Sequence, residues 1–187
     1  MVLRSVWLPG LGLSFASLGY GAMMSFSVLL FVARHWQPAW LAFTIFAVAF
    51  VAVRLAFGNL ADRFGGAKIA QIFAVIQVAG LALMAVSPWM MLGLVGATLT
   101  GIGYSLVYPG LGLEAVTRAP AASKGLAIGT YTAFLELTLA VTSPLLGLLA
   151  SWSSLGSVFL VSAVSAAGAV YVGSHLKRNP RLLESNT

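Results

Sequence analysis

The sequence predicts an all-α membrane protein with six transmembrane helices, and three observations support this prediction. First, 60% of the 187 residues are hydrophobic and 7% are charged, whereas about 25% of the residues in a soluble domain are charged. Second, six apolar runs approach or exceed the roughly 20 helical residues that cross a bilayer. Third, the basic residues fall unevenly between the two sides of these runs. The lipid bilayer is therefore an expected partner of the chain.

Each expected span is bounded by a polar or helix-breaking segment. Arg34 to Pro38 separates the first two spans, Ser87 and Pro88 separate the third from the fourth, and Ser151 to Ser154 separates the fifth from the sixth. The first run is too long for a cleavable signal peptide. The expected spans cover residues 7–32, 39–60, 68–87, 89–113, 125–150 and 155–174, within a bundle at 1–174 that precedes a cytoplasmic tail at 175–187.

The basic residues predict the orientation of the bundle. Arg34, with His35 beside it, is alone on one side, and all other loop and terminal bases lie on the opposite side. Cytoplasmic segments are enriched in Lys and Arg, so both termini are expected in the cytoplasm, with four tryptophans at the outer interface. The bases on the terminal side are Arg4, Arg63, Lys68, Arg118, Lys124, Lys177, Arg178 and Arg181, and the tryptophans are Trp36, Trp40, Trp89 and Trp152.

Several other classes of protein do not fit this sequence. The bases are dispersed between apolar runs, which argues against a nucleic-acid partner. The chain has no cysteine, and His35 and His175 are isolated, so we expect no disulfide and no metal site. There is also no Gly-rich nucleotide loop and no nucleophile–base pair. We therefore expect neither a cofactor nor an enzyme.

Residues 58–68, GNLADRFGGAK, gather an acid and two bases between two apolar runs. Gly58 and Gly65 would permit close helix approach and a tight turn. Asp62 could face the N-terminus of a helix, where the partial positive charge favours a carboxylate. The simpler alternative is that Arg63 and Lys68 only set the membrane orientation.

This stretch resembles the signature loop of the major facilitator superfamily. The family pattern is Gly, three residues, Asp, a base, any residue, Gly, any residue and two bases. The matching residues are Gly58, Asp62, Arg63, Gly65 and Lys68. Ala67 departs from the pattern, because it occupies the first of the two final basic positions. The resemblance implies one half of a twelve-helix fold, with two inverted three-helix repeats in each half.

The fourth span indicates which half is present. First halves of the family commonly carry an Arg upstream of the Gly-rich stretch, and none precedes Gly101 and Gly103 in this span. Residues 109–134 instead resemble the C-terminal half of bacterial sugar- or drug-efflux-like members, and more narrowly the YfcJ/YhhS type. The spans are thus read as helices seven to twelve of an inner-membrane transporter. The Gly-Tyr pairs at 19–20 and 103–104 occupy equivalent positions of the two expected repeats.

Glu136, near the middle of the fifth span, is the main candidate for proton chemistry. A carboxylate at the bilayer centre costs at least a few kcal/mol. It must therefore face a cavity, find a partner or stay protonated. We expect Glu136 to carry a coupling proton. The alternative is a protonated glutamate that only hydrogen-bonds a neighbouring helix.

The resemblance also implies a central cavity lined by the first, second, fourth and fifth helices. The expected cavity residues are Tyr20, Ser25, Tyr104, Ser105, Tyr108 and Thr132, a set that suits a neutral polyol or a mixed aromatic solute. Alternatively, single hydroxyls bond the carbonyls of their own helix. The expected gating motif comprises the loop residues Gly58, Asp62, Arg63, Gly65 and Lys68 together with Arg54, Glu114 and Arg118. Glu114 and Arg118 are spaced to pair on a helix. Gly93, Ala97 and Gly101 form a stripe that favours close packing.

The leading hypothesis is secondary active transport, as proton-coupled efflux of a small organic solute by alternating access. Such an antiporter would need a first six-helix half, supplied in trans or lost, or a homodimer. The alternative hypothesis is an inactive half-transporter fragment or a membrane assembly module. A membrane enzyme is a more distant reading, because no catalytic constellation is present.

Overall fold

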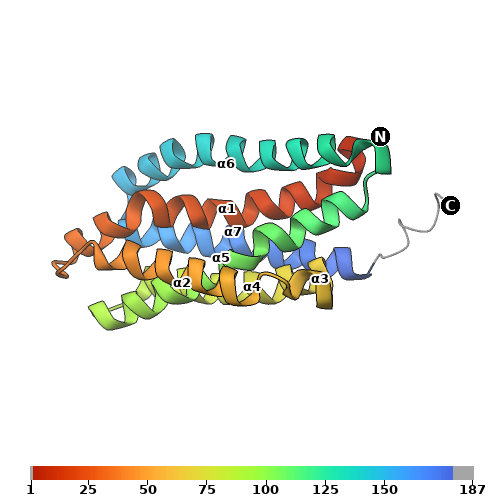
Figure 1. Ribbon diagram of the computed structural model, residues 1–187. Helices are drawn as coiled ribbons and strands as arrows, with labels where there is room; N and C mark the ends of the chain where they lie inside the picture. Colours follow the sequence, from red (N-terminus) through yellow and green to blue (C-terminus); the bar gives the residue numbers. More distant parts are fainter. Residues whose placement is uncertain (1, 179–187) are drawn as a thin grey trace.

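The computed structural model describes residues 2–178, and nearly all of them are helical. The helices are α1 (Val2–Ala33), α2 (Leu41–Phe57), α3 (Leu60–Phe64), α4 (Gly66–Val86), α5 (Met90–Thr117), a 3-10 turn at Ala121–Ser123, α6 (Lys124–Trp152) and α7 (Leu155–Arg178) (Figure 1). Most of the expected tail, residues 179–187 with Arg181, lies outside the described residues, as does the side chain of Arg4.

Six of these helices lie where the six spans are expected, and α3 is a five-residue helix in the signature loop. Five of the six are long and apolar enough to cross a membrane, and α2, with 17 residues, is shorter. The expected span at 39–60 runs too far, because α2 ends at Phe57 and the loop begins at Gly58. The fold class predicted from the sequence is confirmed.

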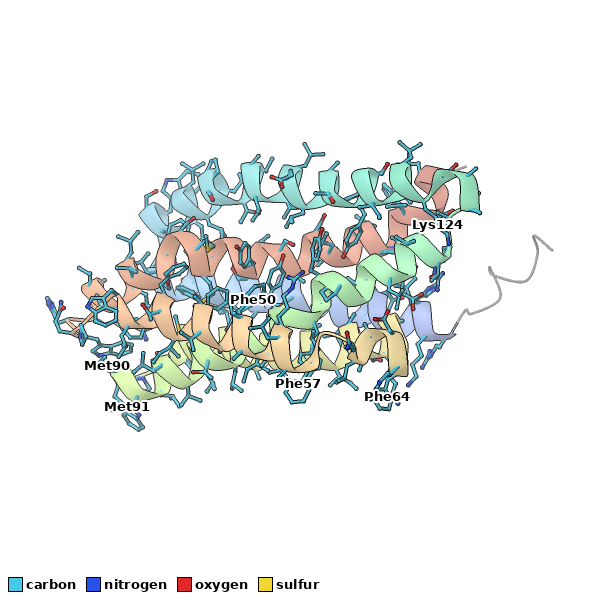
Figure 2. All side chains as sticks on the ribbon, viewed as in Figure 1. Phe50, Phe57, Phe64, Met90, Met91 and Lys124 are labelled. Carbon is cyan, nitrogen blue, oxygen red and sulfur yellow. The ribbon has the colours of Figure 1, made fainter. Side chains whose placement is uncertain are left out.

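The helices run up and down, so that the connections gather at two ends of the bundle (Figure 1). The start of α1 and the end of α7 lie at one end, here called the terminal end, near α3 and the turn before α6. Figure 2 labels Phe64 and Lys124 at this end and Met90 and Met91 at the opposite end. The terminal end carries most of the described loop bases, and Arg34 lies at the opposite end, in the connection that follows α1.

The six long helices form two three-helix units, α1–α2–α4 and α5–α6–α7. Helix α2 of the first unit packs on α5 of the second, and α6 of the second packs on α1 of the first. In the same way α4 packs on α5, α7 packs on α1, and α4 and α7 pack on each other. Exchanging the units leaves this set of contacts unchanged, and α1 and α5 run in opposite directions. The two inverted repeats implied by the resemblance are therefore present.

Glycines on α5 set the distance between α5 and α4. Gly96, Gly103 and Gly110 are seven residues apart, so they lie on one face of the helix. A Cβ added at Gly103 would lie 2.3 Å from the backbone nitrogen of Gln77, and one at Gly110 would lie 2.8 Å from the carbonyl oxygen of Gly66. The backbones thus approach closely, as small residues allow between membrane helices.

The expected stripe of Gly93, Ala97 and Gly101 is a different face of α5. A Cβ at Gly101 would lie 2.4 Å from the carbonyl oxygen of Phe46 in α2, and one at Gly93 would meet the rings of Phe31 and Trp36. This stripe therefore packs against α2 and the end of α1. The contact with α4 is made by the other face, which carries Gly96, Gly103 and Gly110.

Helix α6 is held much less closely than α5. Its buried residues are Ala127, Tyr131, Thr142 and Leu146, and it packs chiefly on α1. A Cβ added at Gly125, Gly129 or Gly147 would meet nothing within 4 Å. Helix α2 is also open on one side, where Val48, Val51 and Leu55 are exposed. One face of each flanking helix is thus uncovered in this chain.

Candidate functional site

Aromatic rings meet where α1, α2 and α5 come together. Tyr20 of α1 and Tyr104 of α5 stack with ring centroids 4.7 Å apart and an interplanar angle of 18°. Phe50 of α2 lies 6.1 Å from the ring of Tyr104 and 6.5 Å from that of Tyr20; Figure 2 labels it in the middle of the bundle. The two Gly-Tyr pairs noted in the sequence therefore meet at the contact between the two units.

Beside these rings is a pocket of about 190 Å³. It is lined by Tyr20, Phe50, Arg54, Tyr104, Tyr108 and Leu135. These residues come from α1, α2, α5 and α6, which are the four helices expected to line the cavity. Three of the expected cavity residues, all tyrosines, are among them.

Arg54, which was expected to belong to the gating motif, lines this pocket. Its guanidinium carbon is 5.7 Å from the ring centroids of both Phe50 and Tyr108, a geometry that favours a cation. Phe50 and Arg54 are four residues apart, so the same face of α2 carries both. Arg54 forms no ion pair with a carboxylate of the described residues. The pocket thus combines flat apolar surfaces with an uncompensated positive charge.

The remaining expected cavity residues do not line this pocket. The Thr132 hydroxyl donates to the carbonyl of Ile128, and the Ser105 hydroxyl donates to that of Ile102, so both bond their own helices. The Ser25 hydroxyl lies 3.3 Å from that of Ser143 and joins α1 to α6. The resemblance placed these hydroxyls on cavity-lining helices, but it does not say which face of each helix is turned inward.

Glu136 lies on the outer side of α6, beside the pocket but not in it. Its neighbour Leu135 lines the pocket, whereas the Glu136 side chain is exposed. It forms no ion pair among the described residues. An exposed carboxylate near the middle of a 29-residue apolar helix is costly in lipid.

Glu114 and Arg118 form the ion pair that their spacing predicts, with 3.1 Å between Nη2 and Oε2. The Glu114 carboxylate also accepts a hydrogen bond of 2.9 Å from the backbone nitrogen of Ala67, at the start of α4. Arg118 donates to the carbonyl of Leu176, near the end of α7. Each charge thus lies at the helix end of opposite partial charge.

The signature loop lies beside this ion pair at the terminal end. Gly65 has φ 92° and lies between α3 and α4, so a tight turn requires glycine there. Gly58 has helical dihedrals and makes no such turn. Asp62, Arg63 and Lys68 are exposed. The carboxylate that meets the N-terminus of α4 belongs to Glu114, and Asp62 lies in the first turn of the short helix α3.

Two buried polar contacts beside the site were not predicted from the sequence. The Gln77 side-chain amide donates to the carbonyl of Ala16 at 2.8 Å and ties α4 to α1. The hydroxyls of Ser17 and Tyr104 lie 2.9 Å apart and tie α1 to α5. An amide inside an apolar span is itself a signal of a buried partner, and Gln77 could have been found in this way.

Known proteins are similar to this chain in sequence. The "Uncharacterized MFS-type transporter YhhS" of Salmonella typhimurium and that of Escherichia coli K12 are each 41% identical over 181 residues. The alignments cover 96% of this chain but 44% of each relative, so the chain spans less than half of their length. The similarity to the YhhS type is as predicted.

A crystal structure of an auto-inhibited POT family peptide transporter has the same fold. It matches with a TM-score of 0.82 at 19% identity, over 94% of this chain and 37% of the other. The sequence pattern of the Major Facilitator Superfamily covers residues 9–186 of this chain. With the signature loop and the paired three-helix units, this match shows that the chain belongs to the major facilitator superfamily.

Proposed function

We propose that this chain is the second half of a secondary transporter, which moves a small organic solute across the membrane by alternating access. The observation that carries the proposal is the aromatic pocket with Arg54 at the contact between the two units. Membrane transporters of this architecture bind their solute near the midplane, at the interface of their repeats. The family assignment supports the same function.

The pocket favours a solute with a flat or sugar-like face and a group that accepts hydrogen bonds or carries negative charge. The rings of Tyr20 and Tyr104 offer extended apolar surfaces, and aromatic side chains with hydroxyl groups bind such faces well. The Arg54 guanidinium supplies up to five donors and a permanent charge. The proposed solute is therefore a polyol or a mixed aromatic molecule that also carries a hydrogen-bond acceptor for Arg54.

A second six-helix half is proposed to cover the open faces of α2 and α6. The relatives are more than twice as long as this chain, and Glu136 is exposed on α6. Such a half, supplied in trans, or a second copy of this chain would remove Glu136 from lipid. Glu136 is proposed to exchange the proton that drives efflux, because a carboxylate in a covered, partly dry site can change its protonation during the cycle.

The protein is further proposed to lie in the bacterial inner membrane with both termini in the cytoplasm. Most described loop bases lie at the terminal end of the bundle, in support of this orientation. The chain has no native cysteine, so a single introduced cysteine reports which side of the membrane its position faces. A reagent outside the cell should label a thiol at Gln37 or Ser153 but not one at Gly66, and the reverse pattern would contradict the orientation.

The test of transport is made with the chain alone and with a first half taken from the E. coli relative, both in liposomes. Uptake of a panel of sugars, aromatic amides and aromatic carboxylates is measured. If the pocket binds the solute, Tyr20→Ala and Arg54→Gln should reduce uptake by about tenfold or more, as for lost contacts of about 1.4 kcal/mol. Tyr171→Ala and Arg178→Gln are the matched controls, because these residues are exposed on α7.

The alternative of an assembly module is favoured by one observation, the open faces of α2 and α6. It predicts that the chain associates with a first half, and that the pocket variants show the same solute uptake as their control variants. Equal uptake by Tyr20→Ala and Tyr171→Ala would therefore contradict solute binding at this pocket.

A further inference from the structure

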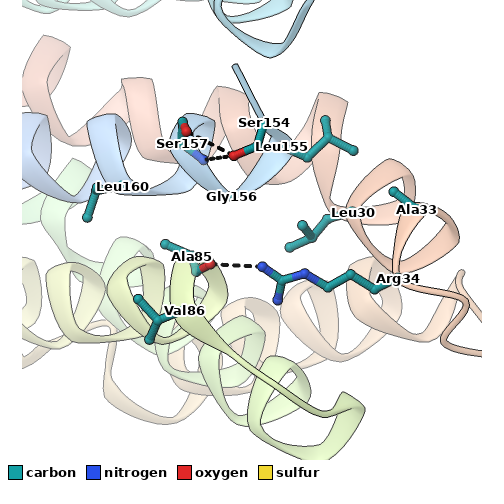
Figure 3. Close-up of a pocket in the computed structure, with 10 residues that line it drawn as sticks. All are labelled: Leu30, Ala33, Arg34, Ala85, Val86, Ser154, Leu155, Gly156, Ser157 and Leu160. Atoms are coloured by element: carbon teal, nitrogen blue, oxygen red, sulfur yellow. Dashed lines mark hydrogen bonds between the residues drawn. The ribbon is translucent and has the colours of Figure 1, made fainter.

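A second cavity, of about 420 Å³, lies at the end of the bundle opposite the terminal end, and Figure 3 shows it in close-up. It is formed where α1 and α4 end and α7 begins, away from the aromatic pocket. Its apolar lining includes Leu30, Val86, Leu155 and Leu160, and its polar lining includes Arg34 and the hydroxyls of Ser154 and Ser157. Neither α2 nor α6 contributes to the lining, so a covering half is not needed to complete it.

Arg34 is fixed in this cavity by the end of α4. Its Nη1 donates to the carbonyl and the hydroxyl of Ser87, and its Nη2 donates to the carbonyl of Ala85 at 2.8 Å. Figure 3 shows the guanidinium reaching across the cavity to Ala85. The ring of Trp36 lies 5.0 Å from the guanidinium carbon. The Met84 carbonyl also lies 3.5 Å from Nη1, so five groups of this chain set the position of the charge.

The guanidinium keeps donors and charge for a further ligand. Arginine has five N–H donors, and the Nε–H donates to no described residue in this arrangement. Burial lowers the pKa of the Arg34 guanidinium from its ordinary value, yet arginine stays protonated at neutral pH. No carboxylate of the described residues pairs with Arg34. A half-buried cation without a counter-charge favours an anion in the same cavity.

The other side of the cavity mouth offers hydroxyls and apolar surface. The hydroxyls of Ser154 and Ser157 lie 2.9 Å apart and can turn toward an acceptor. Val86 is 68% exposed and Leu160 is 51% exposed, so the walls open sideways to the surroundings of the bundle. Trp89 and Trp152 are exposed at the same end, which is typical of the membrane–water interface.

We propose that this cavity binds the phosphodiester headgroup of a glycerophospholipid, with an acyl chain lying over Val86 and Leu160. Arginine matches the oxygens of a phosphate with paired donors, and the two serines can donate to the same group. The exposed apolar walls distinguish a lipid from a free anion, since a free anion gains nothing from them. The site lies on α1, α4 and α7, so it does not depend on the proposed transport function.

The test uses the full chain in detergent micelles and native mass spectrometry. Dioleoyl-phosphatidylglycerol is titrated, and dioleoylglycerol, which has the same chains and no phosphate, is the comparison lipid. Wild-type chain should bind phosphatidylglycerol about tenfold more tightly than dioleoylglycerol, as expected for charge-assisted hydrogen bonds. Arg34→Gln should remove most of this difference.

Arg34 also links α1 to α4, so Arg34→Gln could disturb the fold, and circular dichroism checks for this. Leu160→Trp fills the cavity from an exposed position and leaves Arg34 in place, so it should weaken phosphatidylglycerol binding independently. Lys124→Gln removes one charge at the terminal end and should leave binding unchanged.

Three outcomes would overturn the proposal. Equal binding of the two lipids by wild type would mean that the phosphate is not recognised. Unchanged binding in Leu160→Trp would place the lipid elsewhere. Displacement of phosphatidylglycerol by millimolar inorganic phosphate would indicate a site for a free anion.

Discussion

The two three-helix units share their packing but differ in their chemistry. In both, the first helix brings a Gly-Tyr pair to the centre, where Tyr20 and Tyr104 stack at 4.7 Å. In both, the middle helix packs on the opposite unit. The middle helices nevertheless carry opposite charges in different places: α2 holds Arg54 at the pocket, and α6 holds Glu136 on its exposed side.

This difference shows which properties follow from the repeat and which do not. The pattern of helix pairing is repeated in both units. Charge is placed in one unit without a counterpart at the matching position of the other. The repeat therefore accounts for the position of the cavity between the two units. The binding and coupling chemistry does not follow from the repeat and depends on Arg54 and Glu136 separately.

The largest expected effect separates these two charges. In a complete transporter, Glu136→Gln should abolish uphill transport driven by a pH gradient and spare counterflow, because Gln cannot exchange a proton near neutral pH. Arg54→Gln should reduce both assays, since it acts on the solute. If Glu136→Gln leaves uphill transport at the wild-type level, Glu136 does not carry the coupling proton. Loss of counterflow as well would make Glu136 a binding or folding residue.

The next largest effect compares glycines of α5 and α6. Gly103→Ala should lower the free energy of unfolding by about 3 kcal/mol, because its Cβ would lie 2.3 Å from the Gln77 backbone and cannot be accommodated without movement. Gly129→Ala should be neutral or stabilise by up to about 1 kcal/mol, since the site is open and Ala favours helix. Equilibrium unfolding in mixed micelles measures both. Equal losses would mean that α6 is packed as tightly as α5.

A smaller effect tests which acid joins the units at the terminal end. Glu114→Ala should cost about 2 kcal/mol of unfolding free energy, because it removes a charged hydrogen bond to Ala67 and leaves Arg118 without its partner. Asp62→Ala should change the stability of the isolated chain by less than about 0.5 kcal/mol, as is usual at exposed positions. A larger loss of unfolding free energy in Asp62→Ala than in Glu114→Ala would indicate that Asp62 caps the N-terminus of α4.

The smallest effect distinguishes the stacked tyrosines. Tyr104→Phe should cost about 1 kcal/mol, since its buried hydroxyl lies 2.9 Å from that of Ser17. The Tyr20 hydroxyl has no such partner among the described residues, so Tyr20→Phe should be nearly silent in the same unfolding assay. An equal loss of unfolding free energy in Tyr20→Phe would indicate that the Tyr20 hydroxyl also has a buried hydrogen-bond partner.

Much of this fold could be predicted from the sequence, and the limits have a physical cause. Apolar length gives the spans, and the Glu114–Arg118 pair follows from helical spacing. The orientation of each helix about its axis does not follow, because lipid is as apolar as a protein interior. Leu135 rather than Glu136 therefore turned out to line the pocket, and the α4-facing glycines of α5 were missed. Arg54 was expected to be a structural or gating group rather than a pocket residue, because the sequence does not show that the Phe50 face of α2 meets Tyr104.

The exchange of middle helices between the units has a consequence for biosynthesis. Helix α2 packs mainly on α5, which is translated more than thirty residues after α2 ends at Phe57. Helix α2 must therefore enter the bilayer and wait there, with its face uncovered, until Met90–Thr117 has left the ribosome. A nascent chain that stops after Val86 holds all of the first unit but not the partner of α2. It is expected to remain inserted yet unassembled, and sensitive to membrane proteases, until the second unit arrives.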